Sequence, residues 1–174
     1  GESQEVSPEL PHVEGHVRDG LRGVDHHVGA VRVRGLRQLG ATVAIDHGYV
    51  RATAQRLKGA HIVTDMVTVT GTENLVMAAV LAEGETVIEN AAREPEIVDL
   101  ANMLNEMGAK IVGAGTPVVT IEGVEELHPV THRVVGDRIE AGTFLAGGAL
   151  TGGPVTVHGI DPSYLRVALM KLRA

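Results

Sequence analysis

Between Thr68 and Ala109, the apolar positions change from a helical period to an alternating one and back to a helical one. The first helical stripe follows a threonine-rich loop, in which Thr70 and Glu73 have the spacing of a capping box. Gly84 is expected to end this helix as a left-handed C-cap. The stripe itself consists of Leu75, Val76, Ala79 and Val80.

A short strand and a second helix follow in the same stretch. Residues 86–88 are β-branched and predict the strand. Pro95 suits the first position of a helix, where a backbone N–H would have no partner, and Gly108 suits its end. The apolar stripe of this helix consists of Ile97, Leu100, Met103, Leu104 and Met107.

The same order of elements recurs along the chain. Leu36–Ala41 matches Leu104–Ala109 at a spacing of 68 residues, and each match is a helix end before Gly-Ala and two strands. A helix over Pro162–Leu172 and a strand over Val155–His158 repeat the second helix and the short strand. We therefore predict a mixed α/β (α+β) fold made of β-α-β-α-β-β units of about 70 residues, present in slightly under two copies.

The flanking regions differ in how strongly they predict structure. Two alternating runs on either side of Asp46–Gly48 predict a hairpin, and residues 60–63 predict a further strand. Residues 1–34 have no sustained period and are expected to be irregular and poorly ordered, with order beginning near Gly35. Asp25-His26-His27 lies there, but adjacent His side chains diverge on regular backbone, so we expect no metal site.

Composition narrows the classes of function. The chain is 44% hydrophobic with only 2% aromatic residues and a net charge of −7, which predicts an aliphatic core and argues against a nucleic-acid partner. The absence of Cys excludes disulfides, thiolate metal sites and cysteine catalysis within these residues. No apolar run is long enough to span a bilayer, so a cytoplasmic protein without membrane contact is expected.

Two motifs resemble a known family. The run ENAAREPEIVDLANMLNEMGAKI (89–111) and the later DRIEAGTF (137–144) are similar to UDP-N-acetylglucosamine 1-carboxyvinyltransferases, over a match from about Gly35 to Ala174. The resemblance implies the inside-out α/β prism fold of the enolpyruvyl transferases, in an incomplete copy. Residues 35–136 would be later repeats of the catalytic-loop domain, and residues 137–174 the start of the second domain.

The resemblance also implies a reaction and its site. The family transfers enolpyruvyl from phosphoenolpyruvate to UDP-N-acetylglucosamine in peptidoglycan synthesis, mostly as a monomer and without cofactor or metal. By position, the nucleotide would contact Met66, Val67, Thr68 and Val69. Glu94 and Asp137 would be carboxylates of the active-site cleft, and Arg138 and Glu140 would lie at the hinge between domains. Each has an alternative interpretation. Met66–Val69 would be a plain helix-capping loop, Glu94 a carboxylate favoured by the helix dipole, and Arg138 and Glu140, which follow Asp137, a structural set of ion pairs.

Several departures from the family pattern bear on activity. The family's catalytic Cys and its Arg-Pro-Val-Asp-Leu-His run are replaced by VDHHVGAVRVR upstream of Gly35. Gly136 stands where the family has Pro, and Met66 stands where some members have Lys. We therefore predict an incomplete transferase, inactive as an isolated chain. The alternatives are a non-catalytic substrate-binding or interaction module and one part of a split enzyme; a nucleic-acid module fits least.

Overall fold

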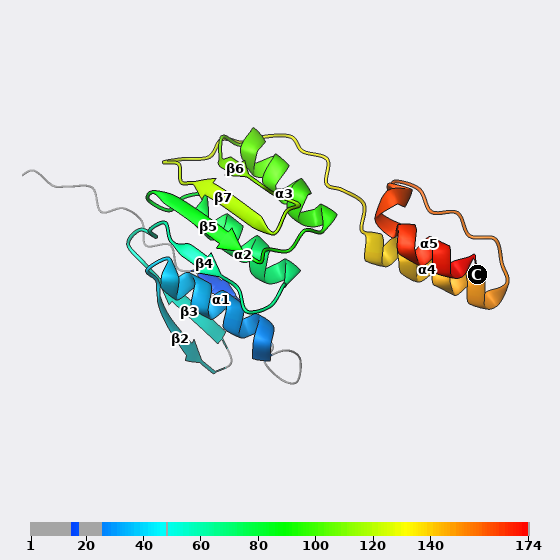
Figure 1. The fold of residues 1–174 in the computed structure, drawn as a ribbon, viewed down its shortest axis with the longest axis horizontal. Coiled ribbons are helices and arrows are strands. Elements are labelled where there is room, and N and C mark those ends of the chain that lie inside the picture. The colour runs from blue at the N-terminus through cyan, green and yellow to red at the C-terminus, as the bar shows by residue number, and fades with distance from the viewer. Residues whose placement is uncertain (1–14, 18–25, 48, 174) are drawn as a thin grey trace, which may run out of the picture. The chain divides into compact units, whose positions relative to one another are not determined.

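The computed structural model describes residues 15–17, 26–47 and 49–173 of the chain. The described structure divides into two compact units, of which the first ends at Pro129 and the second begins at Val130 (Figure 1). The predicted boundary between Gly136 and Asp137 lies a few residues further along. The assignment of the two parts to two enzyme domains stays a prediction.

The first unit begins with a small antiparallel sheet and a helix. Its strands are β1 (Gly15–Val17), β2 (Thr42–Asp46) and β3 (Tyr49–Thr53), in the order β1-β3-β2. Asp46 pairs with Tyr49, which confirms the hairpin predicted at Asp46–Gly48. Helix α1 (His26–Gln38) precedes β2.

Among the described residues, the predicted β-α-β-α-β-β unit is present once in full. Its elements are β4 (His61–Val63), α2 (Val69–Ala79), β5 (Glu85–Glu89), α3 (Pro95–Glu106), β6 (Lys110–Val112) and β7 (Val118–Glu122). The sheet order is β4-β5-β7-β6, with β4 and β5 parallel and the other pairs antiparallel. Pro95 occupies the start of α3, as the sequence predicts.

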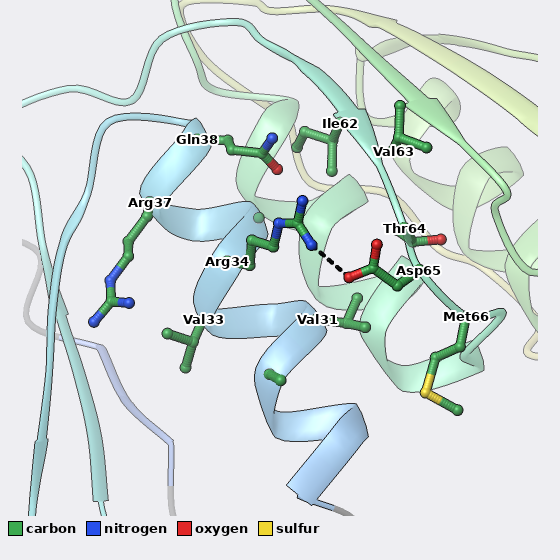
Figure 2. Close-up of a pocket in the computed structure, with 12 residues that line it drawn as sticks. Val31, Val33, Arg34, Arg37, Gln38, Ile62, Val63, Thr64, Asp65 and Met66 are labelled. Atoms are coloured by element: carbon green, nitrogen blue, oxygen red, sulfur yellow. Dashed lines mark hydrogen bonds and ion pairs between the residues drawn. The ribbon is translucent and has the colours of Figure 1, made fainter.

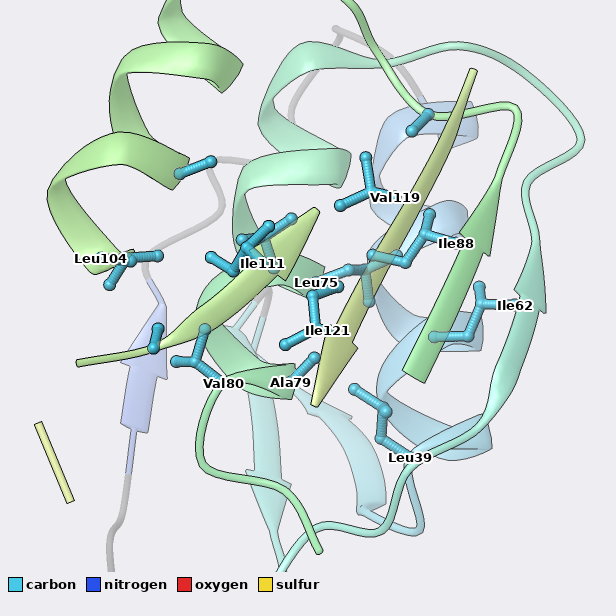
Figure 3. Packing of buried hydrophobic residues seen from close by; sticks show 14 of the residues in the cluster. Leu39, Ile62, Leu75, Ala79, Val80, Ile88, Leu104, Ile111, Val119 and Ile121 are labelled. Atoms are coloured by element: carbon cyan, nitrogen blue, oxygen red, sulfur yellow. The ribbon is translucent and has the colours of Figure 1, made fainter. Parts of the chain in front are cut away.

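One aliphatic core holds this unit together. Leu75 of α2, Ile88 of β5 and Ile121 of β7 are all fully buried, and the side chains of α2 pack against the inner face of the sheet (Figure 3). Alternation along each strand places one apolar face inward. Gly35 lets α1 approach α2 closely, because a Cβ atom at this position would lie 2.4 Å from Leu75 Cδ2.

Two details of the first predicted helix are wrong. The N-cap is Thr68, whose hydroxyl accepts from the Gly71 amide, so Thr70 lies inside the helix and the capping box does not form. The helix ends at Ala79 with Val80 as its C-cap, well before Gly84. Gly84 instead has φ of 90° in the turn that leads into β5, where a left-handed backbone conformation is needed.

The expectation of irregular structure up to Gly35 is also wrong for residues 26–34, which belong to α1. Val31 of this helix is buried in the core, so packing against α2 stabilises a helix that the weak apolar period of the sequence does not predict. Asp25 and the side chains of His26 and His27 lie outside the described residues, so the expectation about a metal site there stays a prediction.

The second unit consists of α4 (Arg138–Thr151), a 3₁₀ turn η1 (Pro162–Leu165) and α5 (Arg166–Leu172). The helical expectation for Pro162–Leu172 is confirmed. The strand expected at Val155–His158 is absent, since these residues form no ladder. Among the described residues of this unit there is no strand with which they could pair, and a lone strand leaves its backbone groups without partners.

Candidate functional site

The parallel pairing of β4 and β5 brings two loops to the same edge of the sheet. Val63 at the end of β4 lies opposite Glu89 at the end of β5, so the segments that follow them emerge together. The first segment leads into α2 and the second into α3. In open α/β sheets, ligands bind outside the carboxyl ends of strands, which makes this edge the candidate site.

Hydrogen bonds between Thr64 and Asn90 join the two loops where they leave the sheet. The Thr64 amide donates to the Glu89 carbonyl oxygen at 3.1 Å, and the Thr64 hydroxyl donates to the Asn90 carbonyl oxygen at 2.9 Å. The Asn90 side-chain amide returns a bond to the Thr64 carbonyl oxygen at 3.0 Å. Asn90 has φ of 60°, a left-handed conformation that Asn tolerates better than most residues.

The predicted nucleotide-contacting residues lie on the first of these loops. Met66 and Val67 are exposed, whereas Thr68 is buried and caps α2. Val69 is the first residue of α2. The Gly71 and Thr72 amides are both bonded to Thr68, which leaves the amides of Val69 and Thr70 for an outside acceptor at the positive end of the helix dipole. The loop can therefore present both apolar surface and backbone donors to a ligand.

A groove of about 490 Å³ lies beside this loop, between α1 and β4 (Figure 2). The groove is lined by Ala30, Val31, Val33, Arg34, Gly35, Arg37, Gln38, Ile62, Val63, Thr64, Asp65 and Met66. An ion pair between Arg34 and Asp65 connects α1 with the loop, as the dashed line in Figure 2 marks. Both side chains are more than half exposed, so the pair orients the loop more than it stabilises the fold.

Arg37 of α1 is turned toward β2. Its guanidinium donates to the Val43 carbonyl oxygen at 3.1 Å, and Figure 2 shows it on the side of α1 away from Asp65. On the side that faces β4, Arg34 supplies positive charge to the groove, and this charge is paired with the carboxylate of Asp65. Arg34 was not singled out from the sequence, because its partner Asp65 is 31 residues away.

Glu94 lies on the second loop, at the N-cap of α3. Its carboxylate accepts from the Arg93 amide at 2.8 Å and makes no capping bond to the helix. The positive end of the α3 dipole favours a negative charge at this position. Glu94 therefore lies at the entrance to α3, on the loop that follows β5.

Asp137 belongs to the second unit, so its predicted place in the same cleft as Glu94 stays a prediction. Its carboxylate caps α4 by accepting from the amides of Ile139 at 2.7 Å and Glu140 at 3.2 Å. Arg138 and Glu140 follow in the first turn of α4. Within the second unit, the observed role of Asp137 is that of an N-cap, and both the cleft and the ion-pair interpretations of these residues stay predictions.

Glu73 is a further acidic group near the two loops. Burial raises the pKa of its carboxyl group, and the negative charge of Glu96 in the first turn of α3 raises it further. The sequence suggested Glu73 only as half of a capping box. No group of three or more potential metal ligands occurs among the described residues. The described residues also contain no helix with the length and apolar character of a membrane span.

Comparison with known proteins adds to this picture. The UDP-N-acetylglucosamine 1-carboxyvinyltransferase of Aeromonas salmonicida is 60% identical over 154 residues, which cover 88% of this chain and 36% of that protein. The protein of the same name from Acidobacterium capsulatum is 57% identical over 153 residues, covering 88% of this chain and 34% of the relative. The chain therefore spans about a third of the length of the curated relatives it matches.

Solved structures share the fold. The enolpyruvyl transferase NikO from Streptomyces tendae has a TM-score of 0.60 and 27% identity, and the match covers 77% of this chain and 33% of that one. EPSP synthase from Acinetobacter baumannii has a TM-score of 0.54 and 23% identity, with 69% of this chain and 27% of that one covered. The second likeness is one of fold alone.

A family model described as EPSP synthase (3-phosphoshikimate 1-carboxyvinyltransferase) matches residues 12–174. This match begins well before Gly35, where the sequence resemblance was expected to start, and it includes all of α1. The earlier start of the family match agrees with the packing of α1 against α2 in the first unit. From this match and the fold of its structural relatives, we conclude that the chain belongs to the EPSP synthase family of enolpyruvyl (carboxyvinyl) transferases.

Proposed function

We propose that this chain supplies the nucleotide-binding part of an enzyme that transfers enolpyruvyl from phosphoenolpyruvate to UDP-N-acetylglucosamine. The observation that carries the proposal is the pair of loops at the carboxyl ends of β4 and β5, beside a groove that Arg34 lines. Identity of 57–60% to proteins named for this substrate supports the choice of ligand. Peptidoglycan synthesis in the cytoplasm follows as the setting.

In this proposal the first loop holds the uridine diphosphate end of the substrate. Met66 and Val67 offer exposed apolar surface, and the amides of Val69 and Thr70 at the helix opening meet phosphate oxygens. Thr68 shapes the loop through its capping bond. Arg34, which is paired with Asp65 of this loop, lies alongside as a cationic group.

Enolpyruvyl transfer requires catalytic groups that this site does not contain. The chain has no Cys to act as general acid, and the Glu94 carboxylate is engaged with a backbone amide. Glu94 and Asp137 as cleft carboxylates, with Arg138 and Glu140 at a hinge, remain part of the proposal. The isolated chain should bind the nucleotide sugar without turning it over. A phosphate-release assay with both substrates checks this, and sustained turnover would refute it.

The alternative is that the chain is an interaction module or one part of a split enzyme. The observation that favours it is the second unit, whose helices leave most of their large apolar side chains exposed. Coexpression with the remaining two-thirds of a relative such as the Aeromonas salmonicida protein distinguishes the cases. Recovery of activity by the mixture supports the split enzyme.

A gain-of-affinity experiment tests the nucleotide site directly. Met66→Lys places a cation beside the proposed diphosphate position, and Met77→Lys places the same charge on the exposed face of α2 as a matched control. The two methionines are comparably exposed, at 38% and 47%. We expect Met66→Lys to tighten binding of UDP-N-acetylglucosamine roughly two- to fivefold at low salt, measured by calorimetry.

The control and the salt dependence complete the test. Met77→Lys should bind as the unmodified chain does. The gain from Met66→Lys should fade as ionic strength rises, because an exposed charge pair is screened. Equal affinities for the two lysine variants would contradict the placement of the nucleotide on this loop.

A further inference from the structure

A single buried hydroxyl connects the two loops of the candidate site. Thr72, in the first turns of α2, is 1% exposed. Its hydroxyl donates to the Thr68 carbonyl oxygen at 2.9 Å and accepts from the Ala92 amide at 3.0 Å. Thr68 ends the loop that carries Met66 and Val67, and Ala92 lies two residues before Glu94.

Both bonds need a hydroxyl. A threonine side chain offers one O–H donor together with acceptor lone pairs, so one atom can serve both partners at once. Ala92 is fully buried, and its amide would lose this partner if the hydroxyl were removed. Valine has the same shape as threonine and neither function, so it removes the link without opening a cavity.

The link acts at a different point from the bonds between Thr64 and Asn90. Those bonds fix the two loops where they leave β4 and β5. Thr72 fixes them again where they enter α2 and α3. On the first loop, residues 65–67 lie between these two points. On the second loop, residues 93–94 follow directly after the point fixed at Ala92.

We propose that Thr72 is a positioning residue, which sets the separation between the loop of Met66–Val69 and the loop of Glu94. The proposal rests on the proposed function, in which the first loop binds the nucleotide sugar. Thr72 does not itself touch the ligand in this view. It holds the loop of Met66–Val69 in the conformation that binds the ligand, so that the loop loses little conformational entropy on binding.

The chain contains a matched control residue. Thr86 on β5 is also fully buried, and its hydroxyl has no hydrogen-bond partner within the described structure. Thr86→Val is therefore the same chemical change at similar burial, without a link between loops. Thr72→Ser completes the set, because it retains the hydroxyl while removing the methyl group.

The experiment compares Thr72→Val, Thr72→Ser and Thr86→Val with the unmodified chain. Calorimetry measures affinity for UDP-N-acetylglucosamine, and ¹⁵N-resolved NMR follows the amides of residues 66–69 and 92–94. We expect Thr72→Val to weaken binding about tenfold or more and to shift both groups of amides. Thr72→Ser and Thr86→Val should bind within about twofold of the unmodified chain.

The two proposals fail in different ways. If the unmodified chain binds and Thr72→Val binds equally well, the positioning role is overturned and the proposed function stands. If the unmodified chain does not bind, the nucleotide site is overturned, and the amide shifts alone decide whether Thr72 connects the loops. If Thr86→Val weakens binding as much as Thr72→Val, loss of a buried hydroxyl is a general effect and the positioning role is overturned.

A further measurement covers the case in which Thr72→Val does not fold. The Ala92 amide of the unmodified chain should exchange with solvent more slowly once ligand is bound, together with the amides of residues 66–69. Slower exchange at the first loop with no change at Ala92 would overturn the link.

Discussion

The two units of the chain have similar apolar content, but the first buries its large apolar side chains and the second leaves most of them exposed. In the first unit, one sheet and its helices bury Leu75, Ile88 and Ile121 completely. In the second, the buried apolar side chains among the described residues are Ala141 and Leu165, while Leu150 is 88% exposed. Its other exposed large apolar residues include Val134, Ile139, Phe144, Val155, Val167 and Met170.

The difference follows from the presence of a sheet. The first unit contains a whole β-α-β-α-β-β repeat, so its helices have an apolar sheet face to cover. The described part of the second unit contains the corresponding helices without strands, and the one large apolar side chain that this part buries is Leu165. Helical propensity and capping are therefore enough for helices, but a core needs the complete repeat.

Amide hydrogen exchange should show the largest contrast. Amides of β5 and β7 belong to a buried antiparallel ladder, whereas α4 and α5 are joined by few buried contacts. We expect exchange in α4 and α5 to be at least about a hundredfold faster than in β5 and β7. Equal protection would show that the second unit is as stable as the first.

Truncation of one leucine in each unit should sharpen the comparison. Leu75→Ala removes a fully buried side chain and should lower the free energy of unfolding by about 2–5 kcal/mol, measured by urea denaturation. Leu150→Ala changes an exposed side chain and should alter that free energy by less than about 0.5 kcal/mol. A large loss from Leu150→Ala would reveal a packing partner for α4.

Adding a methyl group at glycine should act in opposite directions in the two units. A Cβ atom on Gly123 would lie 1.7 Å from the Ala82 carbonyl oxygen, so Gly123→Ala should destabilise the first unit by about 2 kcal/mol or more. Gly147 lies in α4 with open space around it, so Gly147→Ala should favour that helix by about 1 kcal/mol. Thermal unfolding and circular dichroism measure the two effects, and a stable Gly123→Ala variant would contradict the close approach at this turn.

The smallest effect concerns pH and is confined to the first unit. Because the pKa of Glu73 is raised in the folded chain, folding favours its protonated form. Stability from this group is therefore fully present below its unfolded pKa and is lost as pH rises through the folded value. Glu73→Gln should increase stability at neutral pH and leave it unchanged in acid, as paired denaturation curves can show.

Local patterns predicted most of the first unit. The apolar stripes of α2 and α3, Pro95 and the turn at Asp46–Gly48 each depend on neighbouring residues, and all appear in the structure. The first helix still began and ended at other residues than expected. Thr68 and Thr70 can each cap a helix, and the choice between them depends on where the backbone leaves β4.

The features that escaped prediction depend on distant partners. Helix α1 has a weak period, and it is supported by contact of Gly35 and Val31 with the core. Residues 155–158 have strand-like composition but no partner strand among the described residues. The resemblance points to the loop of Met66–Val69, a prediction that still stands to be tested, whereas the hydroxyl of Thr72 reaches Ala92 across 20 residues. Such pairs leave no local signature.

The order of strands in the larger sheet has a consequence for how the chain folds. β6 and β7 form a hairpin with a short connection, so we expect them to pair within microseconds. β5 is central in the sheet, yet its antiparallel partner β7 comes later in the chain than α3 and β6. During synthesis β5 therefore emerges with one edge open, and the ribosome must release β7 before the sheet can close.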